Sequence, residues 1–277
     1  LWEGLGYYSR ARNLQKAARQ IVADYGGEIP SDYDAIRALS GVGDYTAGAI
    51  ASIAFGVPVP AVDGNVLRVI SRILGDARDI SRQDTKNAVR ELLLAVIPRE
   101  APGQFNQALM ELGAVVCLPN GMPLCEQCPV QELCTAHLEG RTAELPVKAA
   151  KKKRRIEERQ VWLIFHNGRV ALRRRPSKGL LAGLWEYPNE LSDAMDWLER
   201  WNISAISWEK AGTGKHIFTH IEWHMTAEAV YAETDELPDG WIWASARELE
   251  QVYAVPNAFQ SFQPAVMERL EKWSVTT

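Results

Sequence analysis

The sequence Leu39-Ser40-Gly41-Val42-Gly43 separates two stretches for which we expect helices, one at Tyr33 to Ala38 and one that starts near Asp44. Glycine tolerates backbone conformations that other residues avoid, so two glycines within five residues favour a tight turn. The stretch therefore predicts two helices joined by a hairpin, a helix-hairpin-helix. The alternative is an ordinary turn between two helices that ends in glycine.

A hairpin of this kind is suited to binding a phosphate group. Glycine leaves backbone N–H groups uncovered, and together with the start of the next helix they form a site for an anion. Because such contacts go to phosphate and not to a base, they hold DNA irrespective of its sequence. The candidate DNA-binding residues of this turn are Leu39, Gly41, Val42 and Gly43.

Around the hairpin, apolar residues recur at helical spacing from the start of the chain to about Leu138, which predicts an all-α domain over residues 1–138. Residues 139–160 contain few apolar side chains and carry the basic run 151–155, so we expect a linker there. The basic run is best explained as a solvated part of that linker, with phosphate contact as the alternative. The helices expected in the first domain, apart from the one before the hairpin, are Asn13 to Ala23, Asp44 to Phe55, Val66 to Leu74, Asp84 to Ile97 and Phe105 to Val116.

The rest of the chain, residues 161–277, has a different pattern. Val161 to Phe165 and Arg169 to Leu172 are predicted strands around an Asn167-Gly168 turn, which is a strong hairpin signal. Leu191 to Trp201 is predicted to be a helix, and Ile217 to Ala232 contains alternating, strand-like stretches. We expect a second, α/β domain, so the fold class is multidomain, α followed by α/β.

Composition and charge limit what the protein can be. The net charge is −4, but residues 1–160 hold 20 Lys and Arg against 19 Asp and Glu, which leaves 11 against 16 for residues 161–277. Contact with DNA is therefore expected mainly in the first part. No stretch approaches the roughly 18 uncharged apolar residues of a membrane helix, and nothing resembles a signal peptide. We expect a cytoplasmic protein with no membrane partner.

Four cysteines lie within 18 residues, at Cys117, Cys125, Cys128 and Cys134. In a reducing compartment such a group indicates a metal site more than disulfides. Zinc sites commonly present two close pairs, whereas here one Cys-x-x-Cys is flanked by two single cysteines. Four thiolates also hold an iron–sulfur cluster. From the spacing alone, a cluster is favoured, zinc remains an alternative, and unliganded core cysteines are a third.

Asp63, in Ala61-Val62-Asp63-Gly64-Asn65-Val66, follows the hairpin by about twenty residues and precedes a predicted helix. The simple interpretation is that Asp63 or Asn65 caps that helix. The functional interpretation is a carboxylate directed into a cleft, where it stabilises an oxocarbenium ion as a glycosidic bond breaks.

The hairpin, this aspartate and the cysteine loop occur in the order and spacing of the endonuclease III superfamily of DNA glycosylases, which the chain resembles. Within it the chain is most similar to the MutY-type adenine DNA glycosylases. The motifs that carry this resemblance are Gly4-Leu5-Gly6-Tyr7-Tyr8-Ser9-Arg10-Ala11-Arg12-Asn13-Leu14, Val62-Asp63-Gly64-Asn65-Val66 and Phe105-Asn106-Gln107-Ala108-Leu109-Met110-Glu111-Leu112-Gly113.

The resemblance implies an enzyme that removes adenine mispaired with 8-oxoguanine or guanine in double-stranded DNA. Bifunctional relatives have a lysine two residues past the Gly-Val-Gly that forms a Schiff base with the sugar; this chain has Tyr45 there. A phenol cannot form an imine, so we expect a monofunctional enzyme that leaves an abasic site. Asp63 would stabilise the sugar cation, Asn65 would orient Asp63, and Tyr45 would help to position or stabilise the sugar.

The resemblance also assigns residues that contact the DNA stack. Family members flip the adenine out of the duplex, and the space it leaves has to be filled. Leu5 and Tyr7 match positions that insert beside the lesion; the alternative is that both are core residues near a helix start. The four cysteines would hold a 4Fe–4S cluster, although seven residues separate Cys117 from Cys125 where the family has six.

The second domain resembles a nudix fold, through the stretch Gly179 to Pro188. The acidic cluster by which a working nudix hydrolase holds Mg²⁺ is not found in Leu191 to Trp201, so a pyrophosphatase is not favoured. Phe218-Thr219-His220 matches the Phe-Ser-His loop by which the family detects 8-oxoguanine, with threonine in place of serine. The alternative for His216, His220 and His224 is a set of surface or metal-binding histidines on one strand.

One family feature lies upstream of the Gly-Leu-Gly-Tyr-Tyr segment, a helix with the glutamate that protonates adenine. The sequence begins after it, so we expect an N-terminally truncated fragment that is inactive alone. We further expect a monomer associated with the bacterial nucleoid. Another glycosylase of the superfamily, a non-catalytic DNA-binding protein and a nucleotide pyrophosphatase are the rival interpretations.

Overall fold

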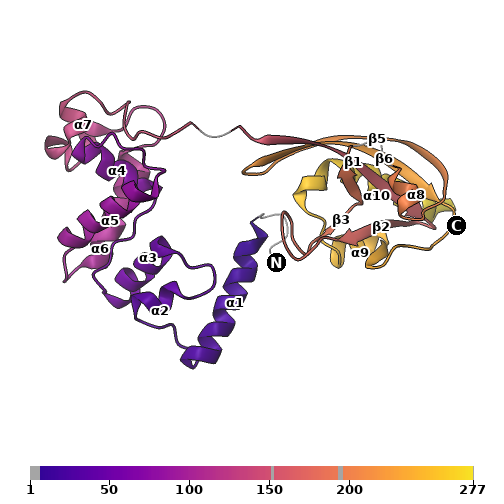
Figure 1. The fold of residues 1–277 in the computed structure, drawn as a ribbon, viewed down its shortest axis with the longest axis horizontal. Coiled ribbons are helices and arrows are strands. Elements are labelled where there is room, and N and C mark those ends of the chain that lie inside the picture. The colour runs from indigo at the N-terminus through magenta and orange to yellow at the C-terminus, as the bar shows by residue number, and fades with distance from the viewer. Residues whose placement is uncertain (1–6, 151–152, 193–195, 277) are drawn as a thin grey trace. The chain divides into compact units, whose positions relative to one another are not determined.

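The computed structural model describes residues 7–150, 153–192 and 196–276. The chain divides into two compact units, Ser9–Lys151 and, in the main, Lys152–Thr277. Helices make up the first unit, and the strands lie in the second (Figure 1). No helix among the described residues has the length and apolar character needed to cross a bilayer.

The first unit is helical, as predicted, and its described residues contain no strand. The expected helix Phe105 to Val116 is an α-helix that continues as a π-helical turn. Short 3₁₀ turns and one last helix follow around the cysteines. The helices are α1 (Tyr8–Tyr25), α2 (Tyr33–Arg37), α3 (Asp44–Phe55), α4 (Gly64–Leu74), α5 (Gln83–Val96), α6 (Pro102–Glu111), η1 (Leu112–Val116), η2 (Cys125–Gln127), η3 (Gln131–Leu133) and α7 (Thr135–Leu138).

The helix α4 is the centre of this unit. Every residue from Val66 to Arg72 is buried. Its apolar side chains pack with those of α5 and with Ile80, in a core formed by Val66, Leu67, Ile70, Ile80, Val89 and Leu93. A helix that is buried on all sides also buries the polar residues in it, and this is how Arg68 and Arg72 come to be 4% and 5% exposed.

The second unit is built on one mixed sheet of order β3-β2-β1-β6-β5, in which β4 pairs with β1 and β7 with β2. The two long strands β1 and β6 are parallel, and β5 and β6 form an antiparallel hairpin. The strands are β1 (Arg155–His166), β2 (Arg169–Arg174), β3 (Trp185–Glu186), β4 (Asn189–Leu191), β5 (Ala205–Ile217), β6 (Ile221–Ala232) and β7 (Trp241–Ala244).

The predicted hairpin at Asn167-Gly168 is confirmed. His166 pairs with Arg169, and the two turn residues have φ values of 44° and 69°. Positive φ at both central residues is the requirement of the tight turn that joins two twisted strands, and Asn-Gly satisfies it.

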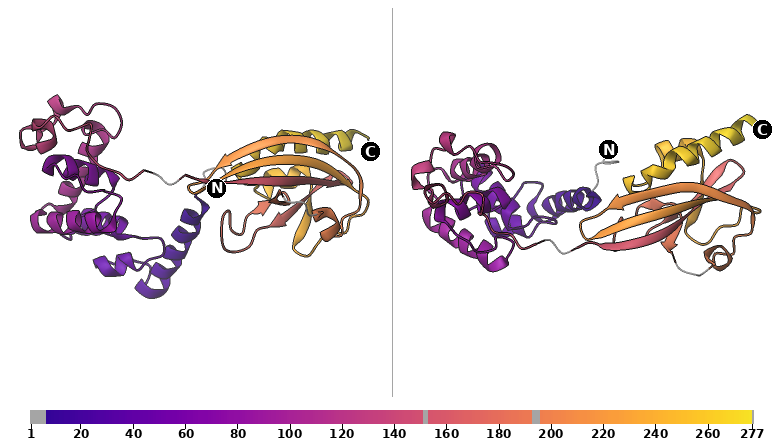
Figure 2. Two further views of the ribbon diagram at one scale, coloured as in Figure 1. Left: turned by 45° about the horizontal axis from the view of Figure 1, so that its top comes forward. Right: turned by 90° about the horizontal axis from the view of Figure 1, so that it is seen from above.

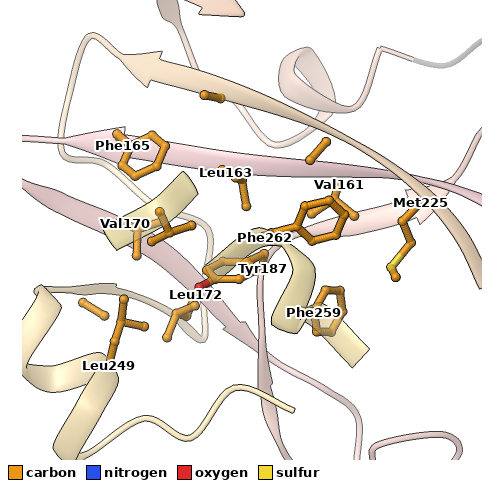
Figure 3. Packing of buried hydrophobic residues seen from close by; sticks show 14 of the residues in the cluster. Val161, Leu163, Phe165, Val170, Leu172, Tyr187, Met225, Leu249, Phe259 and Phe262 are labelled. Carbon is orange, nitrogen blue, oxygen red and sulfur yellow. The ribbon is translucent and has the colours of Figure 1, made fainter. Parts of the chain in front are cut away.

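Both faces of this sheet are covered. On one side α10 (Gln263–Thr276), with α9 (Ala246–Gln251) and η4 (Asn257–Phe262), closes the larger core; Figure 2 shows α10 along that face. Figure 3 shows Leu163 and Phe165 of β1 in this core with Phe259 and Phe262 of η4. On the other side α8 (Trp197–Arg200) packs in a smaller core with Trp162 and Ile164.

Two boundaries predicted from the sequence are wrong. The expected linker 139–160 ends earlier, because β1 begins at Arg155, where it pairs with Ile221. This start of β1 is polar because Glu157 and Arg159 are satisfied by an ion pair of 3.0 Å and not by apolar packing. The expected helix Leu191 to Trp201 is the end of β4 followed by four helical residues, with Asp196 as N-cap. Residues 193–195 lie outside the described part of the chain.

The turn glycine gives a test of the second unit. Gly168 has φ 69°, and a Cβ built on it would lie 2.8 Å from Trp273 Cδ1. We expect Gly168→Ala to destabilise this unit by more than the roughly 1–2 kcal/mol that a left-handed alanine costs. Gly240→Ala is the matched control, because Gly240 has φ 78° with nothing within 4 Å of its Cβ position. Urea unfolding followed by tryptophan fluorescence measures both, and equal losses would contradict a role for the Trp273 contact.

Candidate active site and cysteine loop

The hairpin turn places glycine backbone at the surface. Val42 N donates to Leu39 O at 3.1 Å, and Gly43 is the N-cap of α3. Gly41 has φ 80°, and a Cβ on it would lie 2.6 Å from Asn13 Cβ, so conformation and space both require glycine. Leu39 is 6% exposed, whereas Gly41 and Gly43 are exposed. A phosphate at this turn would therefore meet the glycine backbone, while the Leu39 side chain anchors the turn in the core.

Asp63 is the N-cap of α4, and both oxygens of its carboxylate accept hydrogen bonds. Oδ1 accepts from Val66 N at 2.8 Å, and Oδ2 accepts from Asn65 Nδ2 at 3.0 Å. The hydrogen bond by which Asp63 caps α4 therefore also helps to fix its carboxylate in place. The side chain is half-buried, so one side of it remains open.

The segment that leads into Asp63 is held by Asn106, which is 1% exposed. Its Oδ1 accepts from Ala61 N at 3.0 Å, and its Nδ2 donates to Val59 O at 2.9 Å. A Cβ on Gly48 of α3 would lie 2.4 Å from Pro60 O, so the same segment also lies directly against α3. Asn106 and α3 thus hold the segment before Asp63, and the cap bond to Val66 N holds Asp63 at the start of α4.

Asn65 connects the aspartate to a buried arginine. Arg68 Nη2 donates to Asn65 Oδ1 at 2.9 Å and to Gly113 O at 2.6 Å, and its Nε donates to Cys117 O at 2.7 Å. Burial lowers the pKa of Arg68, and a negative charge on Cys117 acts against this, but a guanidinium stays a cation at neutral pH. A continuous chain of hydrogen bonds therefore runs from Asp63 to the first cysteine.

The glycine of the turn η1 makes room for this chain of bonds. A Cβ on Gly113 would lie 2.6 Å from Asn65 Cβ, closer than real contacts of this kind, and 3.1 Å from Asn65 Cα, which is also tight. The π-helical turn thus brings its carbonyl to Arg68 only because residue 113 is glycine.

The four cysteines line one small cavity of about 30 Å³, together with Arg72 and His137. None of the four forms a disulfide. Burial raises the pKa of Cys125, and the neighbouring Cys134, Cys117 and Cys128 thiols raise it further. Four cysteines that line one cavity, and whose thiolates would repel one another, are a donor set that fits an iron–sulfur cluster.

Arg72 supplies a positive charge to this cavity. Its Nη1 lies 3.2 Å from Cys117 Sγ and donates to Leu118 O at 3.0 Å. Its Nε donates to Leu145 O at 2.8 Å, beyond α7. Arg72 therefore joins the first cysteine to the segment that leaves the helical unit.

The extra residue between Cys117 and Cys125 is accommodated by a closed loop. Leu118 N and Leu124 N both donate to Val116 O, at 3.0 and 2.9 Å, so the chain returns to the point where it left. Met122, at the far side of this loop, is 74% exposed. The longer spacing is taken up outside the cavity.

Tyr45 lies in the first turn of α3 and is 40% exposed. Its hydroxyl donates to Met110 Sδ at 3.3 Å on α6, and no hydrogen bond among the described residues joins it to Asp63 or Asn65. Tyr7 is 70% exposed with φ 46°. That exposure is contrary to the alternative in which Tyr7 is a core residue, and Leu5 lies outside the described residues.

Phe218, Thr219 and His220 form the tip of the β5–β6 hairpin. Phe218 is half-buried, and Thr219 and His220 are exposed. The alternative of three histidines on one strand is wrong, because His216 lies on β5, His220 in the turn and His224 on β6. His216 is paired with Trp223, and His224 with Lys215, so these two histidines face opposite sides of the sheet.

Three residues that matter here were not predicted as site residues: Arg68, Arg72 and Asn106. The signal for the arginines was a pair four residues apart in the stretch Val66 to Leu74, whose other residues are apolar except Ser71. A buried arginine needs hydrogen-bond acceptors for its N–H groups, so the groups that accept from it belong either to the core or to a functional site.

Replacing Arg68 tests the chain of hydrogen bonds. Arg68→Met keeps the length of the side chain but leaves Gly113 O, Cys117 O and Asn65 Oδ1 without this donor. We expect a loss of at least about 3 kcal/mol in the free energy of unfolding. Arg78→Met, which removes an exposed pair with Asp76, is the control and should cost less than about 1 kcal/mol. Similar losses for the two variants in urea unfolding would mean that Arg68 is not a structural centre.

Comparison with known proteins agrees with this geometry. Residues 1–97 match a family model described as HhH-GPD superfamily base excision DNA repair protein, and residues 160–263 match a NUDIX domain. The chain is 36% identical over 293 residues to the mouse adenine DNA glycosylase, covering 86% of this chain and 56% of the mouse protein.

Two further relatives extend the similarity. The human adenine DNA glycosylase is 34% identical, over 95% of this chain and 60% of the human protein. That of Schizosaccharomyces pombe is 32% identical, over all of this chain and 72% of the yeast protein. The chain thus spans roughly three fifths of the length of the mouse and human proteins. Helical and nudix-like units in this order, with identity over both, show that the chain belongs to the adenine DNA glycosylase family.

Proposed function

We propose that this protein removes adenine mispaired with 8-oxoguanine or guanine in double-stranded DNA and leaves an abasic site. The observation that carries the proposal is the half-buried carboxylate of Asp63, held by hydrogen bonds on both oxygens at the start of α4. In a member of the adenine DNA glycosylase family, this arrangement supports a role for Asp63 at the glycosidic bond.

In this proposal Asp63 acts on the deoxyribose. As the bond between adenine and deoxyribose breaks, positive charge develops on the sugar ring, and a carboxylate beside it stabilises that charge or bonds to the carbon. Because Asn65 Nδ2 and Val66 N fix the carboxylate, little reorganisation is needed when the charge forms. Asn65 is itself held by Arg68.

The enzyme is monofunctional in this proposal. Tyr45 occupies the place of the lysine in bifunctional relatives, and a phenol cannot form the imine that leads to strand cleavage. Tyr45 is 40% exposed, and its hydroxyl, bonded only weakly to a methionine sulfur, is available to contact the sugar. Sodium borohydride should therefore trap no covalent complex.

The DNA is held by its backbone at the exposed glycines Gly41 and Gly43, which support phosphate contact without sequence preference. Adenine is flipped out of the duplex, with Leu5 and Tyr7 beside the gap. The 70% exposure of Tyr7 supports its part in this.

The opposite base is read by Phe218, Thr219 and His220, and Thr219 supplies the hydroxyl. Threonine has the same donor and acceptor capacity as serine, with a stiffer χ1. The exposed position of Thr219 at the hairpin tip supports this assignment.

The four cysteines are proposed to hold a 4Fe–4S cluster. Among the described residues no three potential ligands are grouped around one metal ion. A cluster has a different requirement, because its four thiolates bind separate iron atoms around one core. When bound it would fasten the loop at four points and supply an electron-transfer centre. This chain's own contribution is Arg72, whose N–H group lies against Cys117 Sγ.

The Asp63 proposal is tested with Asp63→Asn. Asparagine caps a helix as well as aspartate does, so the fold should survive while the negative charge is lost. We expect adenine release from an 8-oxoguanine:A duplex to fall by about 10²-fold or more. Asp32→Asn is the matched control, because Asp32 also caps a helix, α2, by accepting from Ala35 N.

The assay is done in single turnover with a version extended upstream by the glutamate-bearing helix of the family. The 277 residues alone, run beside it, test the expectation that they release little adenine. Full activity of Asp63→Asn in the extended version would remove the proposed role of Asp63.

The cluster is tested by spectroscopy and metal analysis. We expect absorption in the visible range and about four iron atoms per chain in protein purified without oxygen. Cys128→Ser should lose both. Zinc with no visible absorption would instead establish the alternative that the cysteine spacing left open.

A further inference from the structure

Trp223 is buried beneath the hairpin tip that carries Phe218, Thr219 and His220. It lies on β6, three residues after His220, and is 1% exposed. It belongs to the larger core of the second unit. Nothing in the sequence around it distinguishes it from any core tryptophan, but its contacts do.

The ring of Trp223 holds the ring of Phe218. The two ring centroids are 4.8 Å apart at an angle of 70°, an edge-to-face contact. On its other side Phe218 meets His216, with centroids 4.6 Å apart at 68°. Phe218 is therefore fixed between an aromatic ring of β5 and one of β6, and edge-to-face pairs of this kind favour one orientation.

Trp223 is in turn fixed by charged groups of β1. Its Nε1 donates to Glu157 Oε2 at 2.9 Å, and Arg159 Nη1 lies 3.0 Å from the same oxygen. The guanidinium carbon of Arg159 lies 4.5 Å from the Trp223 ring centroid. Burial acts to raise the pKa of Glu157, but the hydrogen bonds from Trp223 and Arg159 outweigh it and lower the pKa, so the acceptor is a carboxylate.

The same ring is linked to a second loop. The guanidinium carbon of Arg175 lies 5.5 Å from the Trp223 centroid. Arg175 Nε donates to Leu180 O at 2.7 Å, and its Nη1 pairs with Glu186 at 2.6 Å. A phenylalanine or leucine at 223 would fill the core, but it has no N–H group for Glu157 and offers a poorer surface or none for two cations.

The main chain of the tip is also tied down. Phe218 N donates to Ile221 O at 2.8 Å, Arg154 Nε donates to Phe218 O at 3.1 Å, and Arg155 N donates to His220 O at 3.1 Å. These bonds hold the backbone on both sides of Thr219 while its side chain stays exposed. Within the tip, the ring of Phe218 is held by its contacts with Trp223 and His216.

We propose that Trp223 is a positioning residue that sets the orientation of the tip, and with it the discrimination between 8-oxoguanine and guanine opposite adenine. The inference rests on the proposed function of Phe218, Thr219 and His220. A threonine hydroxyl aims correctly only from a fixed backbone, because its χ1 is restricted. A loosened tip would still meet DNA, but it would no longer separate two bases that differ by a few atoms.

The test is the ratio of two dissociation constants, measured with duplexes in which 2′-fluoro-2′-deoxyadenosine, which resists hydrolysis, lies opposite guanine or 8-oxoguanine. We expect Trp223→Leu to lower this preference for 8-oxoguanine about tenfold, the scale of one aromatic pair. Trp223→Phe, which should fold readily, is expected to lower it by a smaller factor, because it keeps the ring and loses the N–H bond.

Trp162→Leu is the matched control for a structural effect. Trp162 is a tryptophan of β1, 7% exposed, which packs on Trp201 in the smaller core on the other side of the sheet. We expect it to lower the melting temperature and leave the preference unchanged. A loss of preference in Trp162→Leu equal to that in Trp223→Leu would overturn the inference, as would an unchanged preference in both Trp223 variants.

A double-mutant cycle separates this inference from the function on which it rests. If Trp223 acts through Phe218, then Trp223→Phe should have no further effect in a Phe218→Ala background. Additive effects would overturn the inference and leave the tip's function intact. An unchanged preference in both Thr219→Val and Phe218→Ala would instead remove the proposed function of the tip, and this inference with it.

Discussion

Arg68 of helix α4 carries a positive charge and is buried, and the arrangement of the first unit depends on this constraint. A guanidinium removed from water is tolerated only where its N–H groups all find acceptors. For Arg68 these are the side chain of Asn65 and the carbonyls of Gly113 and Cys117. The need to satisfy one cation thus joins the aspartate region to the π-helical turn and the first cysteine, which lie more than 40 residues further along the sequence.

The second unit solves a similar problem with aromatic rings. Arg159 and Arg175 are largely buried, and their carboxylate partners and the indole of Trp223 surround them. In both units, therefore, residues that carry charge inside a core also hold surface residues assigned to function. In each unit, a change to these buried charged residues would therefore alter both the core and the candidate functional residues.

The fold was largely predictable, because local signals decide it. Helical periodicity located α1, α3, α4 and α5, and Asn167-Gly168 located the first hairpin. Asp63, Asn65 and the four cysteines followed from spacing and resemblance, and the structure brings the cysteines to one cavity. Their roles in catalysis and cluster binding remain proposals.

The residues that escaped prediction share a physical reason. The start of β1 is polar because ion pairs replace apolar packing, so no alternation of apolar residues marks it. Arg68, Arg72 and Trp223 depend on partners more than 40 residues away in sequence, which no local pattern can show. Asn106 was part of a recognised motif, but the carbonyl and amide groups it binds became visible only in three dimensions.

The early start of β1 has a practical consequence. Arg154 and Arg155 lie at the end of what the sequence presents as linker, yet their bonds to Phe218 O and His220 O complete the hairpin tip. A shortened gene for the second unit that begins at residue 160, where the NUDIX match begins, would therefore delete five of the twelve residues of β1 and release the tip. Expression of this unit by itself has to begin upstream of Arg154.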